Sequence, residues 1–597
     1  MKQGAGAERA HWRHWIGPVV VLLAAALAVA PQLALGNSCG HDFDFHLVSW
    51  FDALNGWRHG IVYPHWAASA NYGAGEARFV FYSPLTWMLG AALGAVLPWT
   101  MVPIAMTFLL LAGTGLATRA LARQALGDGA ATLAGCVALF SGYALFTAYE
   151  RTAFAELAGG FWIPLVLLFA LREVNPAVHI AKRALDGSAV PLALAIAGAW
   201  LSNPTVGVMA CYLLAAVALT QTLLSRSWAP ALRASAGAVL GMGLIAVYLL
   251  PAAWEQRWVD IYQVTEDPGQ TLENNWLYAV HADPSMAFHD QVLRLASTIA
   301  VIMVVAALGG LLMSGLRGSL PGRRSWLFPL GLVPVAVLLL QFPFSRPVWN
   351  LLPDLRFLQF PWRWLLVLEA PMAIFVAAAV WPRKSSRAWR RIAVGAACAG
   401  VFFGLTAFAA KSFFQPCDDE DAVAPMLDEY RSGHGFTGTF EYEPLGADNT
   451  KVVTGMPEAC LVSDATAEFD QDGKTDDTPA AWNTAQENCE ATFAAAQGSG
   501  PEHLRIHAAT DRAGFLVLRL RRYPAWAVKL NGRPVASLPR RDDGLMVVPV
   551  PQGSLDLTVD WTATPDVWLG RWLSGLSMLL LTGLGLLERR LRLARLS

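Results

Sequence analysis

Charge is scarce in this sequence. Asp, Glu, Lys and Arg make up 15% of the 597 residues, whereas 55% are hydrophobic, which is too apolar for a soluble globular protein of this length. The formal net charge is −1. A nucleic-acid binder needs a basic face that neutralises phosphates, and the basic residues here are scattered in short clusters. The composition therefore excludes that class of function and indicates a membrane protein.

Cysteine is also rare, with seven residues, and no CxxC motif or His/Cys cluster indicates structural zinc. Three cysteines fall within apolar runs and are interpreted as small apolar residues: Cys136, Cys211 and Cys398. The other four lie in segments that we place on the oxidising side of the membrane. Cys460–Cys489 is the favoured disulfide, Cys39–Cys417 is a further possible pair, and spacing alone leaves three connectivities open.

Apolar runs long enough to cross roughly 30 Å of hydrocarbon occur twelve times. They lie at about 15–36, 100–122, 129–148, 157–173, 188–202, 203–224, 234–253, 294–314, 326–342, 362–381, 392–411 and 567–587. The first run follows Lys2, Arg9 and Arg13, as in a signal peptide, but it is long and leads on to further spans. We interpret it as a retained anchor.

The orientation follows from Lys and Arg near span ends, which favour the cytoplasm. With the N-terminus inside, alternate loops hold the basic clusters Arg119/Arg123, Arg172/Lys182/Arg183, Arg226/Arg233, Arg317/Arg323/Arg324, Arg383–Arg391 and Arg589–Arg595. This alternation of loops requires that the apolar segment Phe79–Trp99 does not cross the membrane. We therefore expect the segment to lie in the interface or to re-enter, with Tyr82, Trp87 and Trp99 at headgroup level. The alternative is that it crosses and a short run such as 188–202 does not. The pattern predicts a multi-pass bacterial inner-membrane protein with both termini cytoplasmic.

The predicted domains are a transmembrane domain over 1–411, with a large first extracytoplasmic loop at 37–99, an extracytoplasmic domain over 412–566, and a last helix with a basic tail over 567–597. Strand-like alternation of residue types, as in 515–520 and 555–561, indicates that the outer domain is β-rich. Asn531-Gly532 and Asp543-Gly544 are predicted hairpin turns, because these dipeptides tolerate positive φ. No internal repeat at a solenoid period is visible.

The densest group of reactive side chains lies in loop 37–99. Asp42, Asp44 and His46 fall within five residues and could accept a proton from a hydroxyl, or hold a divalent cation, Mg or Mn, that neutralises a leaving phosphate. The plain alternative is a solvated loop whose charges only mark the membrane boundary. Aromatic residues are interleaved with the carboxylates, which a solvated loop does not need, so a site is favoured.

Two further groups face the same side. Arg151 could bind a phosphate through its planar donor fork, with Glu156 as an acid/base or orienting partner, or the two could be an ion pair that fixes a short loop. Arg363, at the mouth of the tenth span, could pair with a lipid-linked phosphate, or it could be a snorkelling interfacial arginine. Glu369, nearly two turns further along, is expected to face the bundle interior, because an ionisable group facing lipid is costly.

Several motifs together resemble a known family. They are Gly40-His41-Asp42-x-x-x-His46, Gly60-x-x-Tyr63-Pro64-x-Trp66, Asn71-Tyr72-Gly73-x-Gly75, Phe81-Tyr82-x-Pro84-Leu85, Arg151-x-Ala153-x-Ala155-Glu156 and Gln359-Phe360-Pro361-Trp362-Arg363. The chain resembles bacterial membrane proteins named as 6-pyruvoyl-tetrahydropterin synthase-related, which are similar to the YfhO-like proteins and to the GT-C class of glycosyltransferases. Nothing resembles the zinc-binding histidines of the soluble pterin enzyme, so no pterin chemistry is expected.

The resemblance implies a GT-C-like polytopic α-helical membrane protein of about 12 transmembrane helices, with its β-rich domain before the last helix. The implied reaction is an inverting transfer of sugar from a polyprenyl-phosphate donor to a glycan, lipid or protein acceptor. Asp42 would be the base, helped by Asp44 and His46 or by a cation on the two carboxylates, with Arg151 and Arg363 on the phosphate and Glu156 orienting one of them. Three more residues are substrate-binding candidates: His65, Tyr82 and Gln359. The alternatives are a lipid or polysaccharide transporter, against which no inverted repeat is evident, and a non-catalytic scaffold with a glycan-binding outer domain.

Overall fold

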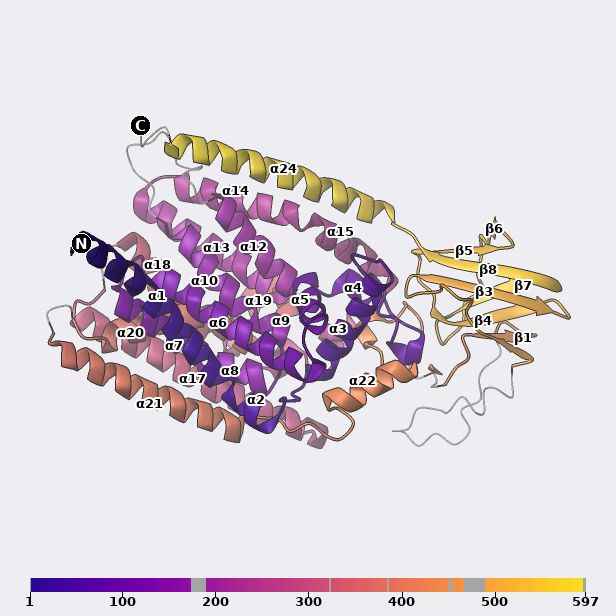
Figure 1. Cartoon of the computed structure of the whole chain (residues 1–597), viewed down its shortest axis with the longest axis horizontal. Coiled ribbons are helices and arrows are strands. Elements are labelled where there is room, and N and C mark those ends of the chain that lie inside the picture. Colours follow the sequence, from indigo (N-terminus) through magenta and orange to yellow (C-terminus); the bar gives the residue numbers. More distant parts are fainter. Residues whose placement is uncertain are drawn as a thin grey trace.

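The computed structural model describes residues 2–172, 189–320, 324–383, 386–448, 451–452, 455–466 and 489–593. Five basic residues used to orient the spans lie outside these ranges: Lys182, Arg183, Arg323, Lys384 and Arg595. The described chain forms a helical bundle with a β-rich domain at one end (Figure 1). The first turns of α1 (Lys2–Ala28) and the last turns of α24 (Pro565–Leu593) lie at the opposite end of the bundle.

The apolar runs fold as helices because a backbone in hydrocarbon must satisfy its own hydrogen bonds. Local signals set the helix ends. At the start of α13 (Pro204–Ser225), Pro204 occupies the first turn and the Asn203 side chain accepts from the Thr205 amide at 2.8 Å. The other helices of the first half are α2 (Ala30–Leu35), α3 (Phe43–Arg58), α4 (Arg78–Phe81), α5 (Pro84–Gly94), α6 (Val102–Ala122), α7 (Asp128–Leu139), α8 (Gly142–Tyr149), α9 (Phe154–Leu157), α10 (Gly159–Ala170) and α12 (Ala189–Ser202). Those of the second half are α14 (Ala229–Leu244), α15 (Ala246–Glu255), α16 (Gln263–Glu266), α17 (Ala287–Leu316), α18 (Arg324–Leu340), α19 (Arg346–Leu351), α20 (Leu365–Val380), α21 (Ala388–Ser412) and α22 (Val423–Ser432).

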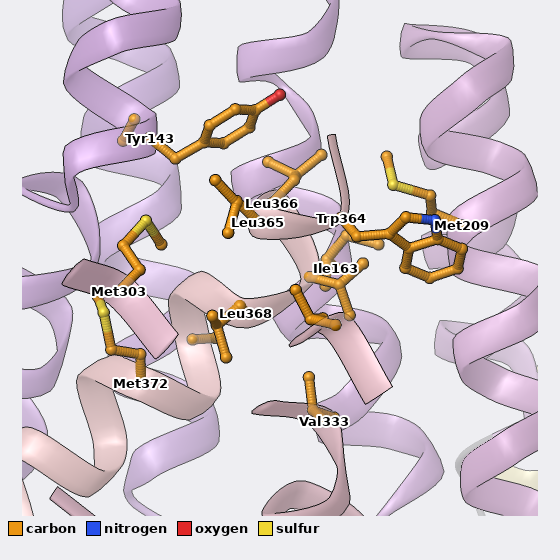
Figure 2. Close-up of a cluster of buried hydrophobic side chains, with 14 of the residues drawn as sticks. Tyr143, Ile163, Met209, Met303, Val333, Trp364, Leu365, Leu366, Leu368 and Met372 are labelled. Atoms are coloured by element: carbon orange, nitrogen blue, oxygen red, sulfur yellow. The ribbon is translucent and has the colours of Figure 1, made fainter. Parts of the chain in front are cut away.

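Helix α20 forms the centre of the bundle. Its residues Leu365, Leu366 and Leu368 pack against Tyr143 of α8, Ile163 of α10, Met209 of α13, Met303 of α17 and Val333 of α18 (Figure 2). A helix that is apolar on every side must be covered on every side, and α20 is buried along nearly its whole length. Because α20 is central, its first turn lies close to the loops between neighbouring helices.

The apolar helices of the described chain fall into three groups: long helices, bent pairs and shorter helices. In the described chain, six helices are long and apolar enough to cross a membrane, or nine if three bent pairs each count as one span. The bent pairs are α7 with α8, α14 with α15, and α18 with α19, and three shorter apolar helices lie at Trp15–Ala28, Phe154–Ala170 and Ala189–Ser202. Each of the twelve predicted runs falls on one of these helices or pairs, and the count of twelve stays a prediction.

The segment Phe79–Trp99 is broken into short helices. The longest is α5, whose 11 residues extend about 16 Å, half of what a span needs. It packs against α3, α6 and α12. Trp87 is fully buried inside the protein and donates to the Tyr82 carbonyl at 3.3 Å, so its predicted place among lipid headgroups is wrong. Protein packing here occupies the apolar surface that the sequence alone assigned to lipid.

The β-rich domain consists of two antiparallel four-stranded sheets, ordered β2-β1-β4-β7 and β3-β8-β5-β6. Their strands are β1 (Ala459–Val462), β2 (Ala491–Phe493), β3 (His503–Thr510), β4 (Gly514–Arg521), β5 (Trp526–Leu530), β6 (Arg533–Pro534), β7 (Leu545–Val550) and β8 (Gly553–Trp561). Leu516 and Leu518 of the first sheet share one apolar cluster with Ile506, Leu557 and Val559 of the second, so the sheets bury their facing sides together. The predicted β-rich domain is therefore present, with its strands between Ala459 and Trp561.

One of the two predicted hairpin turns is correct. Asn531 and Gly532, with φ of 50° and 76°, join β5 to β6. Asp543-Gly544 is not a hairpin, because residues 535–541 before it form no strand. Asp543 instead pairs with Arg541 at 2.7 Å and accepts from the Leu545 amide, which fixes the entry into β7.

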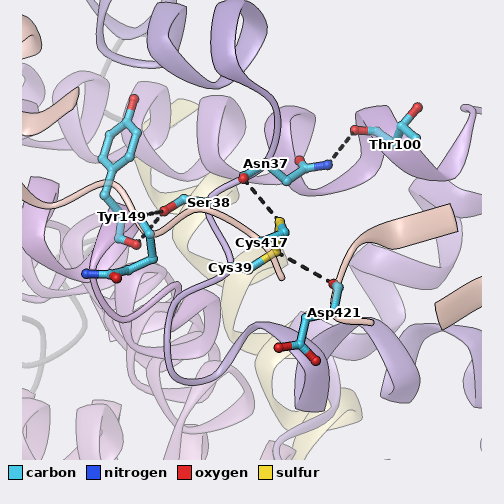
Figure 3. The surroundings of a disulfide bond; sticks show 8 residues. Asn37, Ser38, Cys39, Thr100, Tyr149, Cys417 and Asp421 are labelled. Atoms are coloured by element: carbon cyan, nitrogen blue, oxygen red, sulfur yellow. Dashed lines mark hydrogen bonds between the residues drawn. A yellow bond between two sulfur atoms is a disulfide. The ribbon is translucent and has the colours of Figure 1, made fainter. Parts of the chain in front are cut away.

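Two disulfides, Cys460–Cys489 and Cys39–Cys417, join the four cysteines outside the apolar runs. Both pairs considered from the sequence are therefore confirmed. Cys460–Cys489 joins β1 to the residues just before β2, within the β-rich domain. Cys39–Cys417 joins residues 378 positions apart and ties the entrance of loop 37–99 to the chain leaving α21 (Figure 3). Next to it, Ser38 donates to the Tyr149 carbonyl at 2.7 Å and accepts from the Gln415 amide at 2.9 Å.

Candidate functional site

Asp42 stands just before α3, at the β-domain end of the bundle. Its amide donates to the Arg151 carbonyl at 2.9 Å, and its side chain makes no helix-capping bond, so the carboxylate is available to other groups. The close approach depends on Gly40, where an added Cβ would lie 2.2 Å from the Glu150 carbonyl oxygen. His41 Nδ1 donates to Asp42 Oδ1 at 2.9 Å, and Arg151 Nη2 lies 3.7 Å from Oδ2.

The charge state of Asp42 follows from these neighbours. Burial alone would raise the pKa of the carboxyl group, but the hydrogen bond from His41 and the positive charge of Arg151 outweigh burial and hold the pKa well below its usual range. Asp42 is therefore ionised at neutral pH.

Glu156 joins the two predicted arginines. Its Oε2 accepts from Arg151 Nη1 at 2.6 Å and from Arg363 Nε at 3.2 Å, while its Oε1 accepts from the Tyr143 hydroxyl. All three charged side chains are at most 11% exposed. Buried charges persist only when they are paired and hydrogen-bonded, which this arrangement provides. The loop that carries Arg151 is strained at Thr152, a β-branched residue with φ of 45°.

The Gln359–Arg363 segment belongs to the same group. Arg363 Nη1 donates to Gln359 Oε1 at 2.8 Å and to the Leu358 carbonyl at 2.9 Å, and Gln359 Nε2 donates to Gln270 Oε1 at 2.6 Å. Aromatic rings cover the cations: Arg151 lies 5.0 Å from the Trp362 ring centroid, and Arg363 lies 4.6 Å from that of Phe360. Residues from four separate segments therefore meet at one place.

His46 and Tyr82 line the side of this group in an aromatic cluster. His46 is 1% exposed, its ring centroid is 5.2 Å from that of Phe154 and 6.0 Å from that of Tyr82, and its Nδ1 has no hydrogen-bond partner in the described chain. Burial lowers the pKa of His46 to about 4, so the imidazole is neutral at physiological pH. Burial also raises the pKa of Tyr82 well above its ordinary value. Both residues offer neutral hydrogen-bonding groups.

Asp44 and Asp42 do not share a ligand-like arrangement. Asp44 is exposed, and its Oδ1 accepts from the Phe45 amide at 2.7 Å, whereas Asp42 is held by His41 and Arg151. Across the described residues, no group of three or more His, Cys, Asp and Glu could hold a metal ion. Each carboxylate already has protein partners, the Phe45 amide for Asp44 and His41 and Arg151 for Asp42. The Mg or Mn site stays a prediction, as does the absence of pterin, and no step below uses a cofactor.

His65 lies apart from this group, against the β-rich domain. Its amide donates to Glu502 Oε1 at 2.5 Å, its Nδ1 lies 3.3 Å from the same oxygen, and its ring stacks on Trp561 at 5.5 Å. The motif around His65 placed it among aromatic residues but could not tell a substrate contact from a contact between domains.

Two features of the region were not predicted from the sequence. Glu76 and Arg78 form a buried pair at 2.7 Å, and Arg78 covers the Phe45 ring at 4.4 Å. Tyr143 belongs to an apolar run and carried no signal of its own. Glu369, by contrast, faces the interior as expected and accepts from Ser141 at 2.8 Å.

Comparisons with known proteins bear on the fold and the family. The Archaeoglobus fulgidus oligosaccharyltransferase in its apo form has 12% identity and a TM-score of 0.42, over 73% of this chain and 62% of that chain. The arabinofuranosyltransferase AftD from Mycobacteria has 15% identity and a TM-score of 0.41, over 91% of this chain and 40% of that chain. This chain thus spans less than two thirds of either protein, and neither score establishes a shared fold. No curated protein sequence matches it.

The family match rests on sequence. The model described as "6-pyruvoyl-tetrahydropterin synthase related domain; membrane protein" matches residues 79–412, more than half of the 597 residues. The matched region contains Tyr82, Arg151, Glu156, Gln359 and Arg363, whereas Asp42, Asp44, His46 and His65 precede it. The resemblance stated from the sequence motifs is confirmed, and the chain belongs to the 6-pyruvoyl-tetrahydropterin synthase-related family of membrane proteins.

Proposed function

We propose that this protein transfers a sugar from a polyprenyl-phosphate-linked donor to an extracytoplasmic glycan, lipid or protein acceptor, as a GT-C-type glycosyltransferase of the inner membrane. The observation that carries the proposal is the convergence of an ionised carboxylate, Asp42, with two buried arginines, Arg151 and Arg363, around Glu156. Acceptor activation needs an anionic base, and departure of a phosphate needs fixed positive charge. These two requirements are met within one connected group.

The arginines suit a lipid-linked phosphate. Each guanidinium carries five N–H donors, and Glu156 uses only one from each. Among the described residues, Arg363 Nη2 has no hydrogen-bond partner, so it can donate to a phosphate oxygen. Glu156 and Tyr143 hold the two forks in fixed orientations, which limits the reorganisation needed when charge develops on the leaving group.

The proposed step balances as follows. The acceptor hydroxyl oxygen forms a bond to the anomeric carbon, the bond from that carbon to the donor phosphate oxygen breaks, and the hydroxyl proton passes to Asp42. Polyprenyl phosphate leaves with the bonding electron pair, next to Arg151 and Arg363. Asp42 can receive the proton because its carboxylate is ionised at neutral pH, and its lowered pKa makes it a weaker base than a free carboxylate. Tyr82, Gln359 and neutral His46 would contact substrate hydroxyls beside the reacting atoms.

In this proposal the β-rich domain covers this end of the bundle and binds the acceptor. Trp66 from loop 37–99 packs with Trp526 and Trp561 of the second sheet, and the Tyr523 hydroxyl donates to Glu255 at the end of α15 at 2.5 Å. Aromatic packing and hydrogen bonds such as these keep the domain close to the loop that carries Asp42.

The test is Asp42→Asn, which keeps the shape of the side chain and removes its charge. We expect the variant to fold and insert normally while sugar transfer from polyprenyl-phosphate donor to acceptor falls by about a hundredfold or more, the scale for losing an acid–base group. Transfer is measured with a radiolabelled donor in membranes, and insertion by accessibility of introduced cysteines.

Asp44→Asn is the matched control two residues away. It should retain most of the transfer activity if Asp42 acts alone, and should lose as much as Asp42→Asn only if both carboxylates hold one cation. Full transfer by a folded, inserted Asp42→Asn protein would refute catalysis at this residue and favour the scaffold function.

A further inference from the structure

The elements α15 and α24 and the β-rich domain come together at one end of the bundle (Figure 1). Their residues line a cavity that does not include Asp42. It consists of two adjoining hollows that share Tyr63, His65 and Arg571 as lining residues. Segment 78–83 separates it from the Asp42 group: Val80 lines the cavity, whereas Tyr82 contacts Phe45 and His46. The cavity is therefore close to the proposed active site without being part of it.

The outer hollow has both polar and apolar walls. Its volume is about 420 Å³, which is within the usual size of small-molecule sites, and its remaining lining residues are Ile61, Val62, Glu502, Trp561 and Ala563. Tyr523, Trp561 and His65 form a stack of three rings, with centroid spacings of 5.4 and 5.5 Å. Trp561 is therefore held by two stacked rings, so this wall of the cavity is rigid before any ligand binds.

Four polar groups at this hollow lack partners in the described part of the chain. They are the Tyr63 hydroxyl, His65 Nε2, Glu502 Oε2 and the Arg571 guanidinium, whose recorded contact is with the Trp568 ring at 5.2 Å. Together they offer two groups that can both donate and accept, one anionic acceptor and one cationic donor. Glu502 and Arg571 oppose each other in charge, so a purely anionic or purely cationic ligand would meet one repulsive group.

The inner hollow is apolar. Val80, Val247, Pro251 and Val567 line it together with Tyr248, in a volume of about 100 Å³. It is bounded by α15 and by the first turns of α24, the helix whose span begins at Pro565. A ligand that fills both hollows must carry hydroxyls or similar neutral polar groups at one end and a short apolar segment at the other.

We propose that this cavity binds a neutral membrane glycolipid, with its sugar hydroxyls on Tyr63, His65, Glu502 and Arg571 and the first carbons of its lipid in the inner hollow. Sugar hydroxyls both donate and accept, which matches the mixture of unpartnered groups. Binding as such does not depend on the catalytic assignment. The role of the glycolipid as the acceptor, held while a more distant hydroxyl reaches Asp42, rests on the proposed function.

The experiment uses the full chain in phosphatidylcholine nanodiscs and a diazirine-bearing decyl β-D-glucoside as the photoreactive probe. We expect cross-linked peptides from residues 61–66 and 561–571. Excess decyl β-D-maltoside should compete, whereas decyl phosphate and decylphosphocholine should not. Equal competition by decyl phosphate or decylphosphocholine would overturn the proposal in favour of a phospholipid site.

Two variants test the named contacts. Arg571→Gln should lower cross-linking about tenfold, the scale of a lost hydrogen bond to a charged group, and Tyr63→Phe about threefold. The matched control is Arg533→Gln, an exposed arginine on β6 that does not line the cavity and should leave cross-linking unchanged. Wild-type cross-linking by both Arg571→Gln and Tyr63→Phe would overturn the proposal.

Failure of the proposed function would be seen separately. Asp42→Asn should keep wild-type cross-linking while losing transfer. If the wild-type protein transfers no sugar yet cross-links as described, the glycolipid site stands and only its role as an acceptor site is lost.

Discussion

At the scale of single residues, Asp52 is a buried carboxylate on α3, the helix that follows Asp42. It projects from α3 and accepts from the Ser69 hydroxyl at 2.7 Å, the Ser69 amide at 3.2 Å and the Tyr430 hydroxyl at 3.2 Å. Burial outweighs these bonds and raises the pKa of Asp52 from 3.8 to about 6. Since α22 carries Tyr430, Asp52 links α3 to the chain that leads into the β-rich domain.

The raised pKa predicts a pH-dependent stability. The folded state holds the Asp52 proton more tightly than the unfolded state, so this contribution is complete below about pH 4 and is lost as pH rises through about 6. Its size is about 3 kcal/mol, from the conversion of a pKa difference into free energy. In Asp52→Asn, which cannot ionise, we expect the melting temperature relative to wild type to increase between pH 4.5 and 7.5.

The measurement is thermal unfolding in detergent, followed by tryptophan fluorescence at several pH values. Asp428→Asn on α22, an exposed carboxylate, is the control and should track wild type at every pH. A difference between Asp52→Asn and wild type that is the same at pH 4.5 and pH 7.5 would contradict the assigned pKa.

Residue types in the site were predictable, but their pairing was not. Asp42 stood out because carboxylates and histidines are interleaved with aromatic residues around it, and Arg151, Glu156 and Arg363 because they are charged groups next to apolar runs. That Glu156 would take both arginines, or that Arg78 would pair with Glu76 and bond Ser49, depends on the packing of distant segments. Local sequence contains no information on such partners, and the same is true of His65 and Glu502.

At the scale of elements, α5 decides how the sequence is threaded through the membrane. Its 11 residues are too few for a span, and it is packed against α3 and α6 at the β-domain end. If α5 stays on one side, Trp99 is extracytoplasmic and α6 carries the chain to the cytoplasm at Arg123.

A fusion series tests this threading. We expect a reporter that is active only outside the cytoplasm to be active when fused after Trp99 and inactive when fused after Arg123. The pair differs by one helix, α6, so each fusion is the control for the other. A cytoplasmic reporter after Trp99 would show that Phe79–Trp99 crosses, and the predicted orientation of every later loop would be reversed.

The helices were easier to predict than their bends. A membrane requires long apolar runs, and these are visible in the sequence, so every predicted run coincides with a helix or a bent pair. The bends between α14 and α15, at 72°, and between α18 and α19, at 104°, carry no comparable signal. Likewise Asn531-Gly532 joins two strands and Asp543-Gly544 does not, because a turn dipeptide makes a hairpin only where strands flank it on both sides.

At the scale of the whole molecule, the Cys39–Cys417 bond holds the Asp42 loop and the exit from α21 together. Cys39 lies near the start of the membrane domain in sequence, and Cys417 follows its end. The neighbouring hydrogen bonds of Ser38 connect the same two segments to Tyr149. A cross-link of this kind stabilises chiefly by restricting the unfolded chain, more so for distant residues.

We expect the double variant Cys39→Ser, Cys417→Ser to unfold at a lower temperature than wild type, with a loss of about 2–4 kcal/mol. Adding reductant should lower the melting temperature of wild type more than that of the variant, in which only Cys460–Cys489 remains to be reduced. Cys460→Ser with Cys489→Ser is the comparison, since it removes a disulfide confined to the β-rich domain and separated by 29 residues. Identical melting of the Cys39/Cys417 variant and wild type would show that hydrogen bonds alone hold this joint.

The same bond turns residues 39–417 into a covalent ring that contains most of the membrane domain. A single cut of the backbone in any loop of this ring opens it without dividing the molecule, because both ends remain attached through the sulfur atoms. The polypeptide on either side of the ring, including the β-rich domain and α24, stays tethered to the Asp42 loop after such a cut. Whether a protein cut once in this ring stays covalently in one piece thus depends on the redox state of one bond.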